Sequence, residues 1–173
     1  HDAAVQRAVA QRDVPGIVAI AADRRGVFYT GAAGVASGQP ASPMSVDAIF
    51  GIASMTKAVT SVALMQLVDE KKVGLDDPAS KYLPAFAKVQ VITSFDQKTG
   101  AYTLKPASRP ITIRHLLTHT SGLGYSFTSP IVRDFKPRSG DTFEVGPLLF
   151  EPGADWIYGT STDWVGRLVE TVS

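Results

Sequence analysis

Cysteine is absent from the 173-residue sequence. Its absence excludes disulfide bonds, thiol catalysis and cysteine-ligated metal sites, but it leaves the cellular compartment open. Histidine is scarce, with only His1, His115 and His119. His115 and His119 are four residues apart and could share a helix face, yet no Glu follows His115 where a zinc-binding helix needs one. The sequence therefore predicts no metal site and no cofactor.

Long apolar runs and a charge imbalance are also missing. No stretch of 18 apolar residues is present, so no membrane-spanning helix is expected. The 17 basic and 16 acidic residues give a net charge of +1, and no basic cluster suggests a nucleic-acid partner. The first residues lack the basic-then-apolar pattern of a signal peptide, although an earlier processing step can remove one. A cytoplasmic and an exported bacterial protein both remain open.

The most informative pattern in the sequence is Ser54-Met55-Thr56-Lys57. Residues three apart lie on one face of a helix, so Ser54 and Lys57 can meet. A serine hydroxyl becomes a good nucleophile when a base takes its proton, and a lysine with a lowered pKa can be that base. By itself Ser-x-x-Lys is weak, because a solvated Ser and Lys on a helix surface give the same letters.

The residues around this pattern favour the catalytic interpretation. Residues 48–53 are apolar, and apolar side chains then recur on nearly all sides of a predicted helix over 54–71. That pattern predicts a buried helix with Ser54 near its N-terminus. There the free backbone N–H groups and the helix dipole favour the negative charge of an oxyanion.

Turn residues and hydrophobic periodicity predict the other elements. We expect helices over 2–12, from Asp76-Asp77 to about 83, from Ile113 with Thr112 as a cap, and over 162–172. We expect strands over 17–22 and 27–36, and a strand pair within 88–110 that turns at Lys98-Thr99-Gly100. Loops are expected over 38–43 and, as a long loop or lid, over 124–147.

Several segments together resemble the serine beta-lactamase and penicillin-binding protein superfamily, in particular its class C-type esterases (family VIII carboxylesterases). The motifs run in family order over 50–57, 75–84, 113–123, 150–153 and 156–158. The resemblance implies an α+β fold in which helices flank an antiparallel sheet beside a helical lobe. It makes residues 1–173 the N-terminal portion of one serine hydrolase domain.

The resemblance also assigns roles to three residues. It makes Ser54 the acylated nucleophile, Lys57 its proton partner, and Tyr158 the general base and acid. A tyrosine is ordinarily a poor base at neutral pH, but a nearby ammonium group favours its phenolate. Without that assignment, Tyr158 would be a packed aromatic residue beside Trp156.

Two departures from the family pattern bear on the substrate. Thr160 stands two residues after the tyrosine, where beta-lactamases of this type usually have Asn, which places esterase ahead of lactamase. The third family motif, Lys-Thr-Gly or a variant, follows the tyrosine in the family and is not reached before Ser173. Lys98-Thr99-Gly100 precedes the tyrosine and is interpreted as a turn. We therefore expect a second polypeptide with the C-terminal half, the alternatives being a deliberate truncation or a disordered remainder.

The resulting prediction is a carboxylesterase that acts on a small-molecule ester. Tyr125, Phe127, Trp156 and Thr160 are the candidate substrate-binding residues, although the aromatic side chains could equally cap the core. A beta-lactamase or D-amino-acid peptidase is the first alternative. A non-catalytic penicillin-recognising or scaffolding protein is the second.

Overall fold

The structure is a computed structural model that describes residues 2–36 and 40–173. These residues form two compact units, 1–52 and 53–173, which are described separately. Residues 37–39, including part of the loop predicted over 38–43, lie outside the described residues. No helix in the described ranges is long and apolar enough to cross a membrane.

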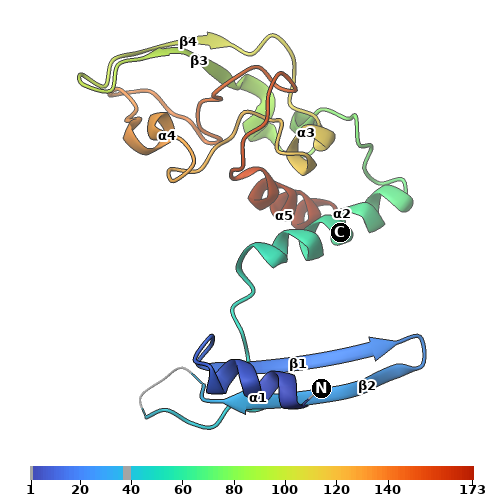
Figure 1. Ribbon diagram of the computed structural model, residues 1–173. Coiled ribbons are helices and arrows are strands. Elements are labelled where there is room, and N and C mark those ends of the chain that lie inside the picture. The colour runs from blue at the N-terminus through green and yellow to red at the C-terminus, as the bar shows by residue number, and fades with distance from the viewer. Residues whose placement is uncertain (1, 37–39) are drawn as a thin grey trace. The chain divides into compact units, whose positions relative to one another are not determined.

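The first unit is a helix packed on a hairpin. Helix α1 (Asp2–Ala10) lies along strands β1 (Gly16–Asp23) and β2 (Gly26–Gly34), as Figure 1 shows in blue. The strands are antiparallel and pair from Gly16–Gly34 to Asp23–Gly26. At the turn, the Asp23 carboxylate accepts a hydrogen bond from the backbone N–H of Arg25. The predicted helix and hairpin are confirmed.

The second unit is built around two packed helices. The short 3-10 helix η1 (Ala53–Met55) leads into α2 (Thr56–Asp69), which packs on the C-terminal helix α5 (Ser161–Val172). Figure 1 shows α2 and α5 side by side. Leu64 of α2 and Val165 and Leu168 of α5 are fully buried. The inward face predicted for the final helix is confirmed.

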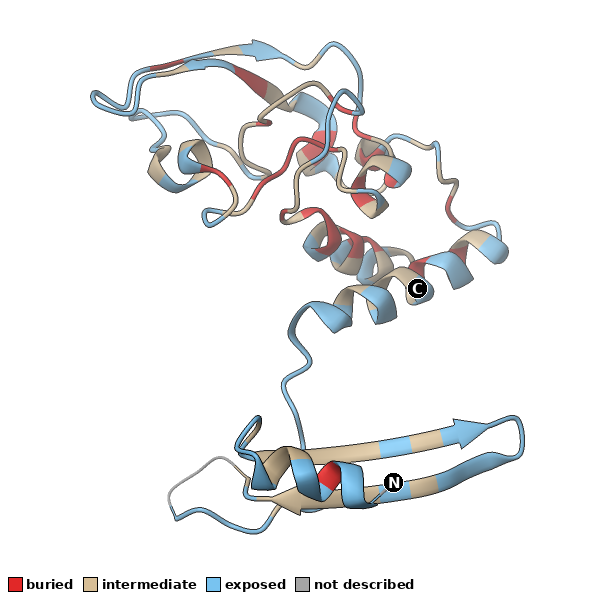
Figure 2. Cartoon of the chain, in the orientation of Figure 1, coloured by how far each residue is buried: buried red, intermediate tan, exposed pale blue. Residues whose placement is uncertain are grey.

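The prediction that the Ser-Lys helix is buried on nearly all sides is wrong for this structure. Leu64 and Leu67 are its buried residues, whereas Val59 is 64% and Val62 60% exposed. Figure 2 accordingly shows much of α2 in pale blue. A helix with apolar side chains all round needs cover on every side. Within the second unit, α5 covers only one face.

A hairpin and two short 3-10 helices also belong to the second unit, and their Phe86 and Val91 lie in the same buried core as Leu64. Their bounds are η2 (Ala79–Lys81), η3 (Pro84–Lys88), β3 (Gln90–Phe95) and β4 (Tyr102–Pro106). The strands are antiparallel, and their turn contains Lys98-Thr99-Gly100 as predicted. The expected capping Asp is wrong, because Pro78 is the N-cap of η2. The Asp77 carboxylate instead accepts hydrogen bonds from the Gly74 N–H and the Lys81 ammonium group.

Two further short helices complete the second unit. Helix α3 (Ile113–Leu117) begins at Thr112, whose hydroxyl accepts from the His115 N–H, so the predicted cap is confirmed. Helix α4 (Pro130–Asp134) lies inside the segment 124–147 that was predicted as loop. The Ser129 side chain caps α4 and proline stands at its first turn, a start signal that the scarcity of periodic apolar residues concealed.

Candidate active site

Ser54 and Lys57 lie where η1 passes into α2. The Lys57 Nζ is 3.5 Å from the Ser54 Oγ, so the predicted meeting of the two side chains is confirmed. Ala53, just before the serine, has a φ of 44°. This left-handed conformation is uncommon for a residue with a Cβ and costs free energy. Ser54 is therefore presented at the start of the helix by a strained turn, and its side chain is exposed.

Tyr158 reaches the same point from a segment 104 residues further along the chain. A hydrogen bond of 2.5 Å joins its hydroxyl to the Ser54 Oγ. The Lys57 Nζ lies 4.8 Å from the centre of the Tyr158 ring. Ser54, Lys57 and Tyr158, which the sequence analysis names as catalytic, thus come together in the second unit as the Ser54 group.

The segment around Tyr158 is held by the loop that follows α3. The Ile157 N–H donates to the His119 carbonyl over 3.0 Å, and the Thr128 hydroxyl donates to the Tyr158 carbonyl over 2.9 Å. A Cβ on Gly159 would stand 1.9 Å from the Leu123 carbonyl oxygen. Only glycine lets the two segments approach this closely. The backbone next to Tyr158 is therefore packed directly on the loop that follows α3.

A second contact fastens the same segments inside the core. The hydroxyls of Ser121 and Ser161 form a hydrogen bond of 2.8 Å, and both residues are fully buried. A buried polar group that finds a partner avoids its desolvation penalty. The loop after α3 is therefore tied directly to the first residue of α5, next to Tyr158.

The electrostatics of the site shift the pKa values of Tyr158 and Lys57 in opposite directions. The neighbouring Lys57 ammonium group, and then the Ser54 hydroxyl, lower the pKa of Tyr158. The pKa of Lys57 is raised, chiefly by its interaction with Tyr158. The lowered lysine pKa that the sequence argument required for a lysine base is thus not found. The Lys57 ammonium group thus eases the loss of the phenol proton from Tyr158, and Tyr158 in turn favours the charged form of Lys57.

Tyr125 lies beside Tyr158 and Lys57. Its hydroxyl donates to the Asp163 carboxylate over 3.0 Å, and its ring meets the Tyr158 ring edge-on at 5.6 Å. Phe127 stacks on the Tyr125 ring at 4.8 Å and is 76% exposed. Both predicted substrate-binding residues therefore stand beside the Ser54 group, with Phe127 at its outer edge.

The other two predicted binding residues, Trp156 and Thr160, contact other parts of the second unit. Trp156 is 60% exposed and contacts the His119 ring at 6.3 Å. Thr160 is the N-cap of α5, and in the described chain its side chain forms no hydrogen bond with the Ser54 group. It lines a small apolar cavity of about 70 Å³ together with residues such as Ile131 and Phe135. The structure does not bring the Thr160 side chain into contact with the Ser54 group.

Sequence reasoning missed two residues of this cluster, His119 and Asp163. His119 precedes Thr120-Ser121-Gly122, which was interpreted only as the end of a helix. Its φ of 56° is a left-handed conformation, which is uncommon for a residue with a Cβ. Asp163 stands in the first turn of α5, where an acidic residue is expected for helix reasons alone. In the sequence, neither residue shows a pattern that distinguishes a place in the active site from an ordinary place at a helix end.

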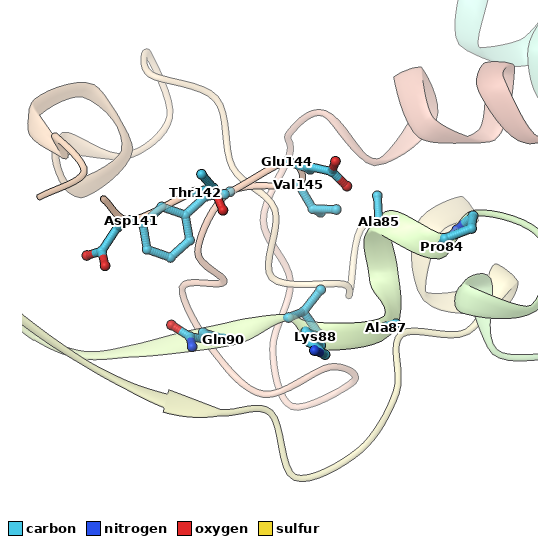
Figure 3. A pocket seen from close by; sticks show the side chains of 12 residues that line it. Pro84, Ala85, Ala87, Lys88, Gln90, Asp141, Thr142, Glu144 and Val145 are labelled. Carbon is cyan, nitrogen blue, oxygen red and sulfur yellow. The ribbon is translucent and has the colours of Figure 1, made fainter. Parts of the chain in front are cut away.

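One cavity lies away from these residues, and another lies beside them. Figure 3 shows one of about 420 Å³, bordered by η3 and the start of β3 on one side and by 141–146 on the other. None of its lining residues belongs to the Ser54 group. A groove of about 320 Å³ reaches the group from the side of α5, where Lys57 and Asp163 line it. Within residues 2–36 and 40–173, no three His, Asp or Glu side chains gather as a metal site.

Comparisons with known proteins agree with the motifs. The family model described as Beta-lactamase matches residues 1–173. The chain belongs to the beta-lactamase family. The resemblance and the beta-lactamase-like fold predicted from the motifs are thereby confirmed.

Members of the beta-lactamase family with a closely similar sequence include both acyltransferases and esterases. The chain is 43% identical over 154 residues to an acyltransferase (calJ) of Penicillium decumbens, covering 82% of this chain and 36% of that protein. It is 34% identical to a lovastatin esterase of Penicillium rubens, covering 99% and 46%. The chain thus spans less than half the length of these relatives.

A solved structure supports the same family and fold. Simvastatin synthase (LovD) from Aspergillus terreus superposes with a TM-score of 0.81 at 34% sequence identity, covering 98% of this chain and 46% of that one. The serine beta-lactamase fold of hydrolases and acyltransferases is therefore the fold of this chain.

Proposed function

We propose that the protein is a carboxylesterase that cleaves a small-molecule ester through an acyl-enzyme on Ser54. The observation that carries the proposal is the 2.5 Å hydrogen bond between the hydroxyls of Ser54 and Tyr158, with the Lys57 ammonium group beside both. A serine becomes nucleophilic when a base within hydrogen-bond reach removes its proton. Tyr158 is in reach, and its lowered pKa makes it the better base of the two candidates.

The proposed reaction has two halves. The Tyr158 phenolate takes the Ser54 proton while Oγ attacks the ester carbonyl carbon, and the resulting oxyanion lies near the N-terminus of α2, where negative charge is favoured. The C–O bond to the alcohol breaks, and the alcohol leaves with the proton from Tyr158. A water molecule then gives a proton to Tyr158 and attacks the acyl-enzyme. The acid departs as Ser54 recovers its proton. Lys57 stays charged and stabilises the phenolate.

A second candidate function, acyl transfer, differs from ester hydrolysis only in the molecule that accepts the acyl group. An acyltransferase is the relative at 43% identity, which favours an alcohol in place of water in the second half-reaction. Both functions need the same Ser54 acyl-enzyme. Turnover of an aryl ester in water and in the presence of an added alcohol separates them, because a transferase yields the new ester and a hydrolase yields the free acid. Nitrocefin hydrolysis would instead favour the lactamase alternative.

We infer that the proposed activity needs polypeptide beyond residues 1–173. The relatives are more than twice as long, and the third family motif is not within this sequence. We propose that a further stretch of polypeptide supplies the remaining wall of the pocket, on a second chain or on a continuation of this one. A stable and active monomer of 18.4 kDa without a companion would rule out that requirement.

Covalent labelling of Ser54 tests the central claim. We expect a fluorophosphonate probe to add its mass to the protein at Ser54, and Ser54→Ala to lose both labelling and turnover of a short-chain aryl ester while thermal unfolding is unchanged. Ser61→Ala, on the same helix, is the matched control and should label normally. Retained turnover in Ser54→Ala would reject the assignment. A folded wild-type protein that is never acylated would favour the non-catalytic alternative.

A further inference from the structure

His119 contacts the Tyr158 segment at three points. Its carbonyl accepts the Ile157 N–H, and its Nδ1 lies 3.4 Å from the Gly159 nitrogen, which donates to it. Its ring packs against the Tyr158 ring, with centres 4.9 Å apart and a tilt of 48°. His119 therefore holds the residue before Tyr158, the residue after it, and the ring between them.

The Gly159 hydrogen bond defines the protonation of the imidazole. A ring nitrogen can accept an N–H only when it carries no proton, so His119 must be neutral with its proton on Nε2. Burial, and then the positive charge of Lys57, lower the pKa of His119, whereas Asp163 opposes them. The environment thus keeps the imidazole in the form that the hydrogen bond requires.

We propose that neutral His119 is a positioning residue that holds the Tyr158 hydroxyl on the Ser54 Oγ. The inference rests on the proposed function of Ser54 and Tyr158, and it adds a residue that acts through its contacts with the Tyr158 segment. The phenol stands at the end of a side chain whose backbone is fixed on both flanks by His119. A shift of about 1 Å in a catalytic group can slow a reaction about 100-fold.

The backbone of His119 suggests the substitutions that separate its roles. Asn tolerates a positive φ, and its Oδ1 can stand near the place of Nδ1 and accept the Gly159 N–H. His119→Asn thus keeps the acceptor and gives up the ring. His119→Phe keeps the ring contact with Tyr158 and gives up the acceptor. A role confined to filling space would be preserved better by Phe than by Asn.

The test compares the acylation of Ser54 in these variants of the full protein. Stopped-flow release of p-nitrophenol from p-nitrophenyl acetate gives kcat and KM, and intact mass spectrometry follows the acyl-enzyme. We expect His119→Phe to lower kcat about 10-fold or more with little change in KM. His119→Asn should recover to within about threefold of the wild-type kcat, because the acceptor is what positions the phenol.

His115→Asn is the matched control for histidine replacement. The His115 Nδ1 also accepts a backbone N–H, that of Thr112 at 3.2 Å, but at the cap of α3. The His115→Asn variant should change the thermal unfolding temperature without changing kcat. Wild-type kcat in His119→Phe, or equal losses in both His119 variants that follow their unfolding temperatures, would overturn the positioning role. A wild-type protein that is not acylated at Ser54 would instead overturn the proposed function beneath it.

Discussion

Replacing Tyr158 by Phe tests the proposed base with a change of a single hydroxyl. That hydroxyl forms a hydrogen bond with Ser54 and interacts with the Lys57 ammonium group, while the ring packs on His119 and Tyr125. The ring contacts remain in the variant, so its thermal unfolding should stay close to that of the wild type. Proton transfer by a positioned side chain is worth about 10²–10⁴ in rate. We expect kcat for p-nitrophenyl acetate to fall by about that factor.

The pH dependence gives this prediction a second readout. Because Lys57 lowers the pKa of Tyr158, the phenolate forms below the pH at which a free tyrosine ionises. The raised pKa of Lys57 keeps the ammonium group charged over the same range. The wild-type acylation rate should therefore rise with pH as Tyr158 loses its proton, and decline only when Lys57 loses its own. Tyr158→Phe should lack the rising limb.

Tyr102→Phe is the control for loss of a tyrosine hydroxyl. The Tyr102 hydroxyl donates to the Asp141 carboxylate over 2.7 Å, outside the Ser54 group. This variant should unfold at a lower temperature and keep the wild-type acylation rate. If Tyr158→Phe keeps both the rate and the rising limb, the phenol is not the base, and the assignment to Tyr158 is wrong.

Three further substitutions test the packing and the charges of the second unit. Gly159→Ala should lower the free energy of unfolding by about 1–3 kcal/mol in a urea titration, because its Cβ would collide with the backbone; an unchanged midpoint would contradict that contact. Gly166→Ala, inside α5 with its nearest contact at 3.8 Å from Thr60, should instead raise it by up to about 1 kcal/mol, and a loss of stability would show an unseen obstruction. The Lys105 ion pair, and then hydrogen bonds, lower the pKa of Glu151 to about 2, so the stability of wild type over Glu151→Gln should be present above the ordinary carboxyl pKa and disappear as pH falls through about 2. A difference between these two proteins that is independent of pH would contradict the ion pair.

Local patterns in the sequence predicted most of the elements. The three-residue spacing of Ser54 and Lys57 brings them together on one helical turn, whatever surrounds the helix. The hairpins, the Thr112 cap and the inward face of the final helix follow from turn residues and periodicity for the same reason. Tyr158 was reached by family resemblance alone, because no local rule relates it to a serine 104 residues away.

The sequence by itself thus determined the helix that presents Ser54 and Lys57, and, through its motifs, the beta-lactamase family. The tertiary structure decided that α5 covers one face of α2 within the second unit, that the pKa of Tyr158 is lowered, and that His119 holds the Tyr158 segment. Hydrophobic periodicity tells which side chains avoid water, but not which element covers them. The pKa of a side chain depends on charges brought close by folding, and those distances do not appear in the order of the residues.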